Sequence, residues 1–280
     1  MIHINKPTDN VKEVFEICIS NFEDAVFKAR LNSVSNFIET ATNNYDTQAL
    51  VNNLNSIPKV TNVNNIVAID EMKKVYEQKL VRKGQPGRKY YEKLRLAAKN
   101  NICPLCNQRT VTTLDHVLPK TSYPTFAVTP FNLIPACADC NKIKDTYQPN
   151  TSEEEIIHPY YDNISNKQYL YASVREETPP SIIFYINLSE PPIIIEKRLQ
   201  KHFSLFKLNE LYTSNAAEEL SNISYRLSKL FDTGGRESVI EYLKDEFESR
   251  YRNNKNSWQT AMYKTLYEND WFCNGGFKIE

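Results

Sequence analysis

The sequence lacks any long hydrophobic run, and this absence excludes a membrane-spanning helix. Among its 280 residues there is no stretch approaching the roughly 18 apolar residues that indicate a transmembrane segment. The first ten residues, MIHINKPTDN, are too polar for a secretory signal peptide. We therefore expect a cytoplasmic protein with no membrane partner, in a reducing compartment where disulfide bonds are rare.

The sequence also lacks internal repeats, low-complexity tracts and a net charge. Its 34 Lys and Arg residues equal its 34 Asp and Glu residues, so the overall charge neither favours nor excludes a polyanionic partner. Positive charge is concentrated locally, because the segment from Lys73 to Lys120 holds 12 basic residues against three acidic ones, a local charge of +9. Such a field would attract a phosphate backbone, although a solvated helix surface would give the same pattern.

Six cysteines in a chain without expected disulfides need another explanation. Cys18 and Cys273 are isolated, and we expect them to be small buried apolar residues. The other four form two C-x2-C pairs, CPLC and CADC, thirty residues apart. Two such pairs can place four thiolates around one tetrahedral zinc ion at Zn–S distances of about 2.3 Å. The pattern therefore predicts a closed, structural zinc site rather than redox thiols or unrelated buried thiols. Its four ligands are Cys103, Cys106, Cys137 and Cys140.

The two cysteine pairs enclose the segment 107–136, which contains the sequence TLDHVLPK. The β-branched run TVTTLDHVL predicts one strand, FNLIPAC predicts a second, and CADCNKIKD predicts a helix that begins at the second cysteine pair. These elements form a ββα unit. We expect it to bring Asp115, His116, Asn132 and Asn141 toward one cleft.

The order C-x2-C, D-H-x2-P-K, N-L, C-x2-C-N-x2-K resembles the zinc-ribbon type of HNH endonucleases, within the His-Me finger group. The motif spans Cys103 to Lys144, about a seventh of the chain. The neighbouring segments GRKYYEKL and IIHPYYDN further resemble stand-alone bacterial HNH proteins, which are often linked to anti-phage defence alongside an ATPase. The resemblance implies a metal-dependent endonuclease that hydrolyses phosphodiester bonds, and it suggests an ATPase partner encoded nearby. We expect DNA as the substrate.

The resemblance also assigns roles within the motif. His116 would be the general base, and its ordinary pKa suits that task. Asn132 would orient the histidine or order the strands, while Asp115 and Asn141 would bind one catalytic divalent ion. Many members have histidine where this chain has Asn141, and an amide oxygen is a harder ligand, so Mg²⁺ or Mn²⁺ is expected. The residues expected to contact nucleic acid are Lys120, Lys144, Arg88, Arg95 and Lys99.

With this resemblance, the predicted fold is α+β: a mainly helical protein around a zinc-clamped ββα-metal HNH unit, with an additional β-hairpin. Residues 1–100 form a helical region. It contains two basic helices, one over about 70–83 and a second that begins at Arg88. Residues 101–165 form the zinc-bound HNH nuclease domain. In residues 166–280, QYLYASVRE and SIIFYINLS predict the hairpin, and helices follow with a break at TGGRE.

Three alternatives remain open at this stage. His158 either lines the cleft or is a structural histidine that anchors the hairpin. The substrate could be RNA, such as tRNA, because the motif recognises a phosphate and not a sugar. The zinc unit could also be a non-catalytic module that binds nucleic acid or a protein.

Overall fold

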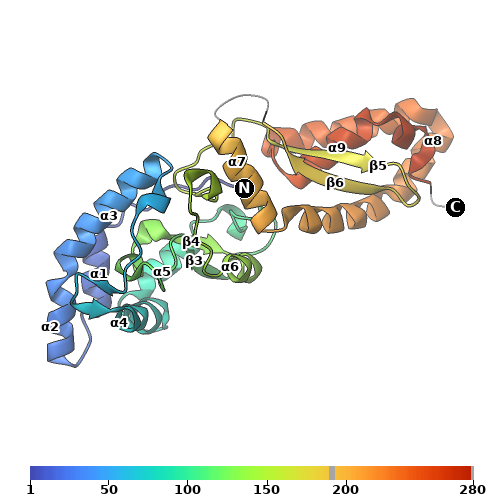
Figure 1. Cartoon of the computed structure of the whole chain (residues 1–280). Helices are drawn as coiled ribbons and strands as arrows, with labels where there is room; N and C mark the ends of the chain where they lie inside the picture. The colour runs from blue at the N-terminus through green and yellow to red at the C-terminus, as the bar shows by residue number, and fades with distance from the viewer. Residues whose placement is uncertain (189–192, 279–280) are drawn as a thin grey trace. The chain divides into compact units, whose positions relative to one another are not determined.

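The structure, a computed structural model, describes residues 1–188 and 193–278. As predicted, it is α+β and mainly helical, and the described residues contain three two-stranded antiparallel sheets (Figure 1). The chain divides into two compact units, Met1–Asn163 and Ile164–Glu280. No helix among the described residues is both long and apolar enough to cross a bilayer.

The first unit begins with three helices that build its core. They are α1 (Val11–Ile19), α2 (Ala25–Ser33) and α3 (Ser35–Leu50). Asn10 and Asp24 cap α1 and α2, because each side-chain oxygen accepts a 3.0 Å hydrogen bond from a backbone N–H three residues later. The core formed by their buried faces includes Leu114 and Leu133 from the central strands. The N-terminal helices therefore support the ββα unit directly.

The basic segment follows as a short hairpin and two helical stretches. Its elements are β1 (Asn62–Val63), β2 (Val67–Ala68), α4 (Ile69–Lys74) with the π-helix Val75–Val81 that continues it, and α5 (Arg88–Arg95). Both basic helices lie where the sequence predicts them. The start of α5 requires Gly87, because an added Cβ there would lie 2.6 Å from Cys18 Sγ and 2.6 Å from the backbone oxygen of Lys79.

Two strands and a helix form the centre of the first unit, in the predicted order. They are β3 (Thr113–His116), β4 (Leu133–Ala136) and α6 (Ala138–Lys144). The strands pair antiparallel, with Asp115 opposite Ile134 and His116 opposite Leu133. Two short 3-10 turns, Pro124–Phe126 and Pro130–Asn132, shape the connection between them. Further 3-10 turns lie at Leu54–Ser56, Lys99–Asn101 and Ser152–Glu154.

The second unit combines a hairpin with helices. Its elements are β5 (Leu170–Arg175), β6 (Ser181–Ile186), α7 (Ile193–Leu205), α8 (Leu208–Asn253), α9 (Trp258–Glu268) and the π-helix Phe272–Gly276. The strands β5 and β6 pair along their whole length, which confirms the predicted hairpin. The predicted second strand extended to Ser189, which lies outside the described residues.

Helix α8 folds back on itself at the predicted glycine break. Gly235 has φ +66°, a conformation that favours glycine. The two arms then run antiparallel, because Arg250 on the second arm lies 3.8 Å from Glu219 on the first. The break predicted at TGGRE is therefore confirmed.

Candidate active site

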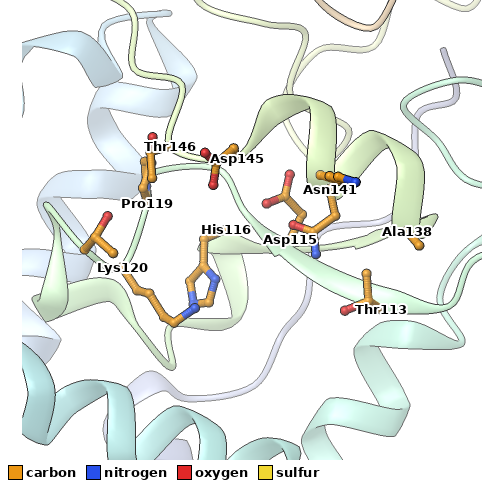
Figure 2. A pocket seen from close by; sticks show the side chains of 11 residues that line it. Thr113, Asp115, His116, Pro119, Lys120, Ala138, Asn141, Asp145 and Thr146 are labelled. Carbon is orange, nitrogen blue, oxygen red and sulfur yellow. The ribbon is translucent and has the colours of Figure 1, made fainter.

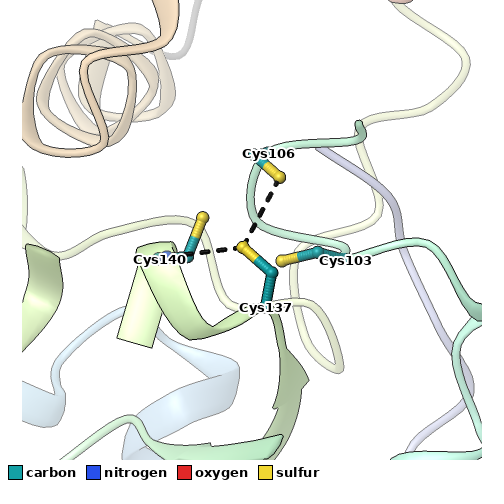
Figure 3. A group of neighbouring side chains, drawn as sticks. All are labelled: Cys103, Cys106, Cys137 and Cys140. Carbon is teal, nitrogen blue, oxygen red and sulfur yellow. Dashed lines mark hydrogen bonds between the residues drawn. The ribbon is translucent and has the colours of Figure 1, made fainter. Parts of the chain in front are cut away.

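The four cysteines of the C-x2-C pairs meet in one buried cluster, as the sequence predicts (Figure 3). Their sulfur atoms all lie within 4.8 Å of one another, and Cys106 Sγ is 4.0 Å from Cys137 Sγ. Four Zn–S bonds of about 2.3 Å in a tetrahedron would place the sulfur atoms about 3.8 Å apart. The cluster is therefore of the right size and donor type to hold a metal ion such as zinc.

Two backbone N–H groups donate hydrogen bonds to sulfur atoms of the cluster. The N–H groups of Arg109 and Cys140 each donate a 3.4 Å bond to sulfur, at Cys106 and Cys137 respectively. Such bonds favour the thiolate, which is the form that binds metal.

A hollow lies over β3, the loop that follows it and α6 (Figure 2). Asp115, His116 and Asn141 all line this hollow, so three of the residues expected to share a cleft do share one. Asn132 is fully buried and does not belong to the lining. The remaining lining residues are Thr113, Pro119, Lys120, Thr121, Ala138, Lys142, Asp145 and Thr146.

Asp115 is a buried carboxylate beside Lys144. Its side chain is 4% exposed, and its Oδ1 lies 3.6 Å from Lys144 Nζ. Its Oδ2 is buried without a hydrogen-bond partner in the described part of the chain. Burial raises the pKa of this carboxyl group to about 6, and the charge of Lys144 opposes the shift. An unpartnered buried carboxylate oxygen is unfavourable, and a divalent cation bound by Asp115 and Asn141 would satisfy it.

The His116 ring is neutral, and one of its nitrogen atoms can accept a proton. Its Nε2 lies 2.9 Å from the backbone oxygen of Ala127. Because a carbonyl oxygen only accepts hydrogen bonds, Nε2 carries the hydrogen and Nδ1 carries the lone pair. Burial lowers the pKa of His116 to about 3, so the ring is neutral at physiological pH. The arrangement therefore leaves Nδ1 able to accept a proton.

Asn132 acts on the backbone behind the hollow. Its Nδ2 donates to the backbone oxygens of Leu118 (2.9 Å) and Phe126 (3.2 Å), and its Oδ1 accepts from the Leu118 N–H (2.7 Å). These bonds tie Asn132, at the end of the loop between the strands, to the start and the middle of that loop. Phe126 directly precedes Ala127, whose carbonyl group holds the His116 ring. Asn132 thus orders the backbone around the histidine and does not bond its ring.

The two lysines expected at a phosphate occupy different environments. Lys120 lines the hollow, and its Nζ lies 5.1 Å from the centroid of the Tyr76 ring. The side chain of Lys144 is only 1% exposed, and its Nζ donates a 2.6 Å bond to the backbone oxygen of His116. Lys144 would have to break this bond to reach a phosphate, whereas Lys120 would not.

The other predicted nucleic-acid contacts lie outside the lining of the hollow. Arg88 and Arg95 are both partly buried and share one acidic partner, since Arg88 pairs with Glu92 and Arg95 lies 3.0 Å from it. Lys99 is exposed. The positive charge of α5 is therefore partly neutralised within the helix itself.

His158 is a buried residue of the first unit and is not part of the lining. Its Nε2 lies 3.2 Å from the Tyr45 hydroxyl group on α3, and its Nδ1 accepts a 3.2 Å bond from the Tyr160 N–H. Its own N–H donates to Asp162 at 2.6 Å. These contacts tie His158 to α3 and to the segment that follows the ββα unit.

Sequence reasoning missed two residues of this region. Asp145 lines the hollow at the end of α6, one helical turn after Asn141, and its place in the run CADCNKIKD could have indicated it. Tyr76 packs on the His116 ring with a centroid separation of 4.5 Å. No local signal connects Tyr76 to a residue forty positions later.

Two known proteins are similar to this chain in sequence. Protein ea31 of Escherichia phage lambda is 31% identical over 234 residues, which is 78% of this chain and 78% of ea31. Septu protein PtuB of Bacillus thuringiensis is 35% identical over 85 residues, 29% of this chain and 32% of PtuB. The chain thus spans about a third of the length of PtuB. No family model matches the chain, and no solved structure matches it.

Proposed function

This chain belongs to the family of protein ea31 of Escherichia phage lambda, and we propose that it is a metal-dependent endonuclease of the HNH type that cleaves DNA. The proposal is carried by the joint position of Asp115, His116 and Asn141 around one hollow, beside the four-cysteine cluster. A module that only binds has no need of a carboxylate, an imidazole and an amide converging on one space. The nuclease function is assigned to residues 101–165.

Asp115 and Asn141 are the residues that would hold Mg²⁺ or Mn²⁺, since both ions prefer oxygen ligands. The unpartnered Oδ2 of Asp115 is the observation that fits such an ion. A bound divalent ion supplies charge neutralisation at the phosphate and at the departing oxygen. Lys120, at the edge of the hollow, would contact a phosphate oxygen of the substrate.

His116 would take the proton of the attacking water at Nδ1. The Ala127 carbonyl group holds the Nε2–H and continues to accept that bond once the ring becomes an imidazolium. A negative phosphate next to the ring would raise its pKa toward the working pH. Asn132 keeps the loop that presents the Ala127 carbonyl group in place.

The four cysteines would hold a structural zinc ion. Four sulfur ligands complete a tetrahedral shell and leave no open position for substrate. The zinc would therefore contribute folding free energy to the ββα unit and not take part in hydrolysis.

We further propose a role in bacterial anti-phage defence with an ATPase partner. The resemblance of the segments around the motif to stand-alone bacterial HNH proteins supports this role, and so does the partial similarity to Septu protein PtuB. The partner is tested by measuring whether the product of an adjacent ATPase gene binds this chain and changes its cleavage rate.

The enzymatic proposal is tested with supercoiled plasmid and a structured RNA, each incubated with Mg²⁺ or Mn²⁺. We expect the wild type to cut the plasmid, and Asp115→Ala and Asn141→Ala each to lose cleavage while they keep their zinc. Cleavage of RNA alone would overturn the DNA assignment. Cleavage of neither substrate, with either ion, would favour a non-catalytic zinc module.

A further inference from the structure

Tyr76 connects the basic segment to the candidate active site. It lies near the start of the π-helix Val75–Val81, which continues α4. Short π-helical turns are uncommon and occur often at functional sites. Tyr76 is 7% exposed and is buried in the unit together with Val75 and Leu80.

The Tyr76 ring contacts two residues that line the hollow. It packs on the His116 ring with a centroid separation of 4.5 Å and an interplanar angle of 62°, at the near end of the range that aromatic pairs favour. It also carries the Lys120 ammonium group 5.1 Å from its centroid, within the range of a cation–π contact. One ring therefore touches both the proposed base and the proposed phosphate ligand.

The polar contacts of His116 do not by themselves fix the tilt of its ring. The Ala127 oxygen holds one atom, Nε2, and Lys144 binds the backbone oxygen of His116. A single hydrogen bond at one ring atom leaves the imidazole able to rock about that point. The Tyr76 ring packs against the imidazole and opposes this motion.

We propose that Tyr76 is a positioning residue that fixes the tilt of the His116 ring, so that Nδ1 faces the hollow, and holds the Lys120 ammonium group at the same opening. The expected effect on kcat rests on the proposed nuclease function, whereas the expected effect on the orientation of the His116 ring does not. Burial raises the pKa of the Tyr76 phenol, so it stays protonated and does not act as a base itself. The ring, and not the hydroxyl group, is the part that the role requires.

The kinetic test compares Tyr76→Phe with Tyr76→Leu on plasmid DNA in Mg²⁺. We expect Tyr76→Phe to keep the wild-type kcat and Tyr76→Leu to lose about 10- to 100-fold in kcat, the effect of misplacing a reacting group by about 1 Å. Tyr90→Leu is the matched control, because Tyr90 is a buried tyrosine on α5 that does not line the hollow. Tyr76→Met, which fills similar space without a ring, replaces Tyr76→Leu if the latter does not fold.

A second readout does not depend on activity. The chain has four histidines, so ¹⁵N-histidine labelling gives a simple NMR spectrum in which His116→Ala identifies the His116 signals. We expect wild type and Tyr76→Phe to show the single Nε2–H tautomer, and Tyr76→Leu to show averaging of the ring nitrogens. Unchanged His116 signals with a wild-type kcat in Tyr76→Leu would overturn the proposal. If the wild type cuts neither DNA nor RNA, the nuclease function fails, and the NMR comparison alone decides the positioning role.

Discussion

Among single residues, the Asp115–Lys144 pair shows that burial can give a lysine a structural role in place of a substrate contact. The motif indicates that Lys144 is a phosphate contact, yet its side chain is 1% exposed and its ammonium group lies between Asp115 and the His116 carbonyl oxygen. Lys144 therefore offsets part of the free-energy cost of burying the Asp115 carboxylate, through its contact with Oδ1. The other oxygen, Oδ2, remains without a partner among the described residues and stays available to a metal ion.

Lys144 should contribute to the stability of the folded protein through its pairing with Asp115. Lys144→Met should lower the free energy of unfolding by about 3 kcal/mol at pH 7, because removing one partner of a buried ion pair leaves the other charge uncompensated. Lys142→Met is the control, since Lys142 lies on the same helix but is exposed. Urea unfolding measures both variants. Equal, small losses would mean that Asp115 does not depend on Lys144.

The second prediction concerns the pH dependence of stability due to His116. The folded protein keeps this ring neutral down to about pH 3, whereas in the unfolded chain histidine binds a proton below about pH 6.5. Between these values the unfolded state binds more protons, so the folded state loses stability as the pH falls. From pH 7 to pH 5, the wild type should lose about 2 kcal/mol more than His116→Ala.

Urea unfolding of both proteins at several pH values measures this difference. Asp115, whose pKa is raised to about 6, changes stability in the opposite direction over the same range. That contribution, and any loss of zinc, occurs in both proteins and largely cancels in the comparison. Parallel losses in the two proteins would contradict the burial of His116.

At the scale of elements, the parts with a local signal were predictable and the parts set by tertiary packing were not. Strands β3 and β4 and helix α6 follow from β-branched runs and a cysteine knuckle, and the turn in α8 follows from Gly235. The π-helical continuation of α4 has no such signal, because an i→i+5 hydrogen-bond pattern depends on what the helix packs against. For the same reason, neither the Tyr76–His116 contact nor the orientation of Asn132 away from the hollow could be read from spacing.

The prediction at this scale concerns the cysteine cluster. Cys103→Ser and Cys140→Ser should each lose zinc and unfold the ββα unit, since the binding energy of a structural zinc ion is folding energy. Cys273→Ser is the control, because Cys273 is also buried but lies in the second unit. Elemental analysis should find about one zinc per chain in the wild type and in the control. A wild type purified without zinc would contradict the assignment.

In the whole molecule, the basic segment from Lys73 to Lys120 is less positive than its sequence indicates, because acidic side chains pair with several of its basic residues. Lys93 lies 2.7 Å from Asp9, Lys73 lies 3.0 Å from Asp70, and Glu92 is shared by two arginines. The pairing with Asp9 comes from a distant part of the chain and could not be foreseen by counting charges. We keep the prediction that this segment contacts the nucleic acid backbone, and it can be tested through salt dependence.

Arg88→Glu/Arg95→Glu should weaken duplex DNA binding regardless of sequence. Each phosphate contact contributes about 0.9 to the slope of log affinity against log salt concentration, so the slope should become flatter. Arg226→Glu/Lys229→Glu is the matched control, because it changes the net charge equally at exposed positions of the second unit. Fluorescence anisotropy at several salt concentrations gives the slopes. Identical slopes for the wild type and the α5 variant would assign these charges to a protein interface or to solvent.

The rate of plasmid cleavage in Mg²⁺ by wild type, His116→Ala and His158→Ala tests most directly whether His116 is the general base of a nuclease. Both histidines are buried in the first unit, but only His116 lines the hollow. With zinc content and helicity matched, His116→Ala should cut at least about 100-fold more slowly than the wild type, as expected for loss of a general base, while His158→Ala should retain cleavage. A His116→Ala protein that cuts as fast as the wild type would show that His116 is not the base.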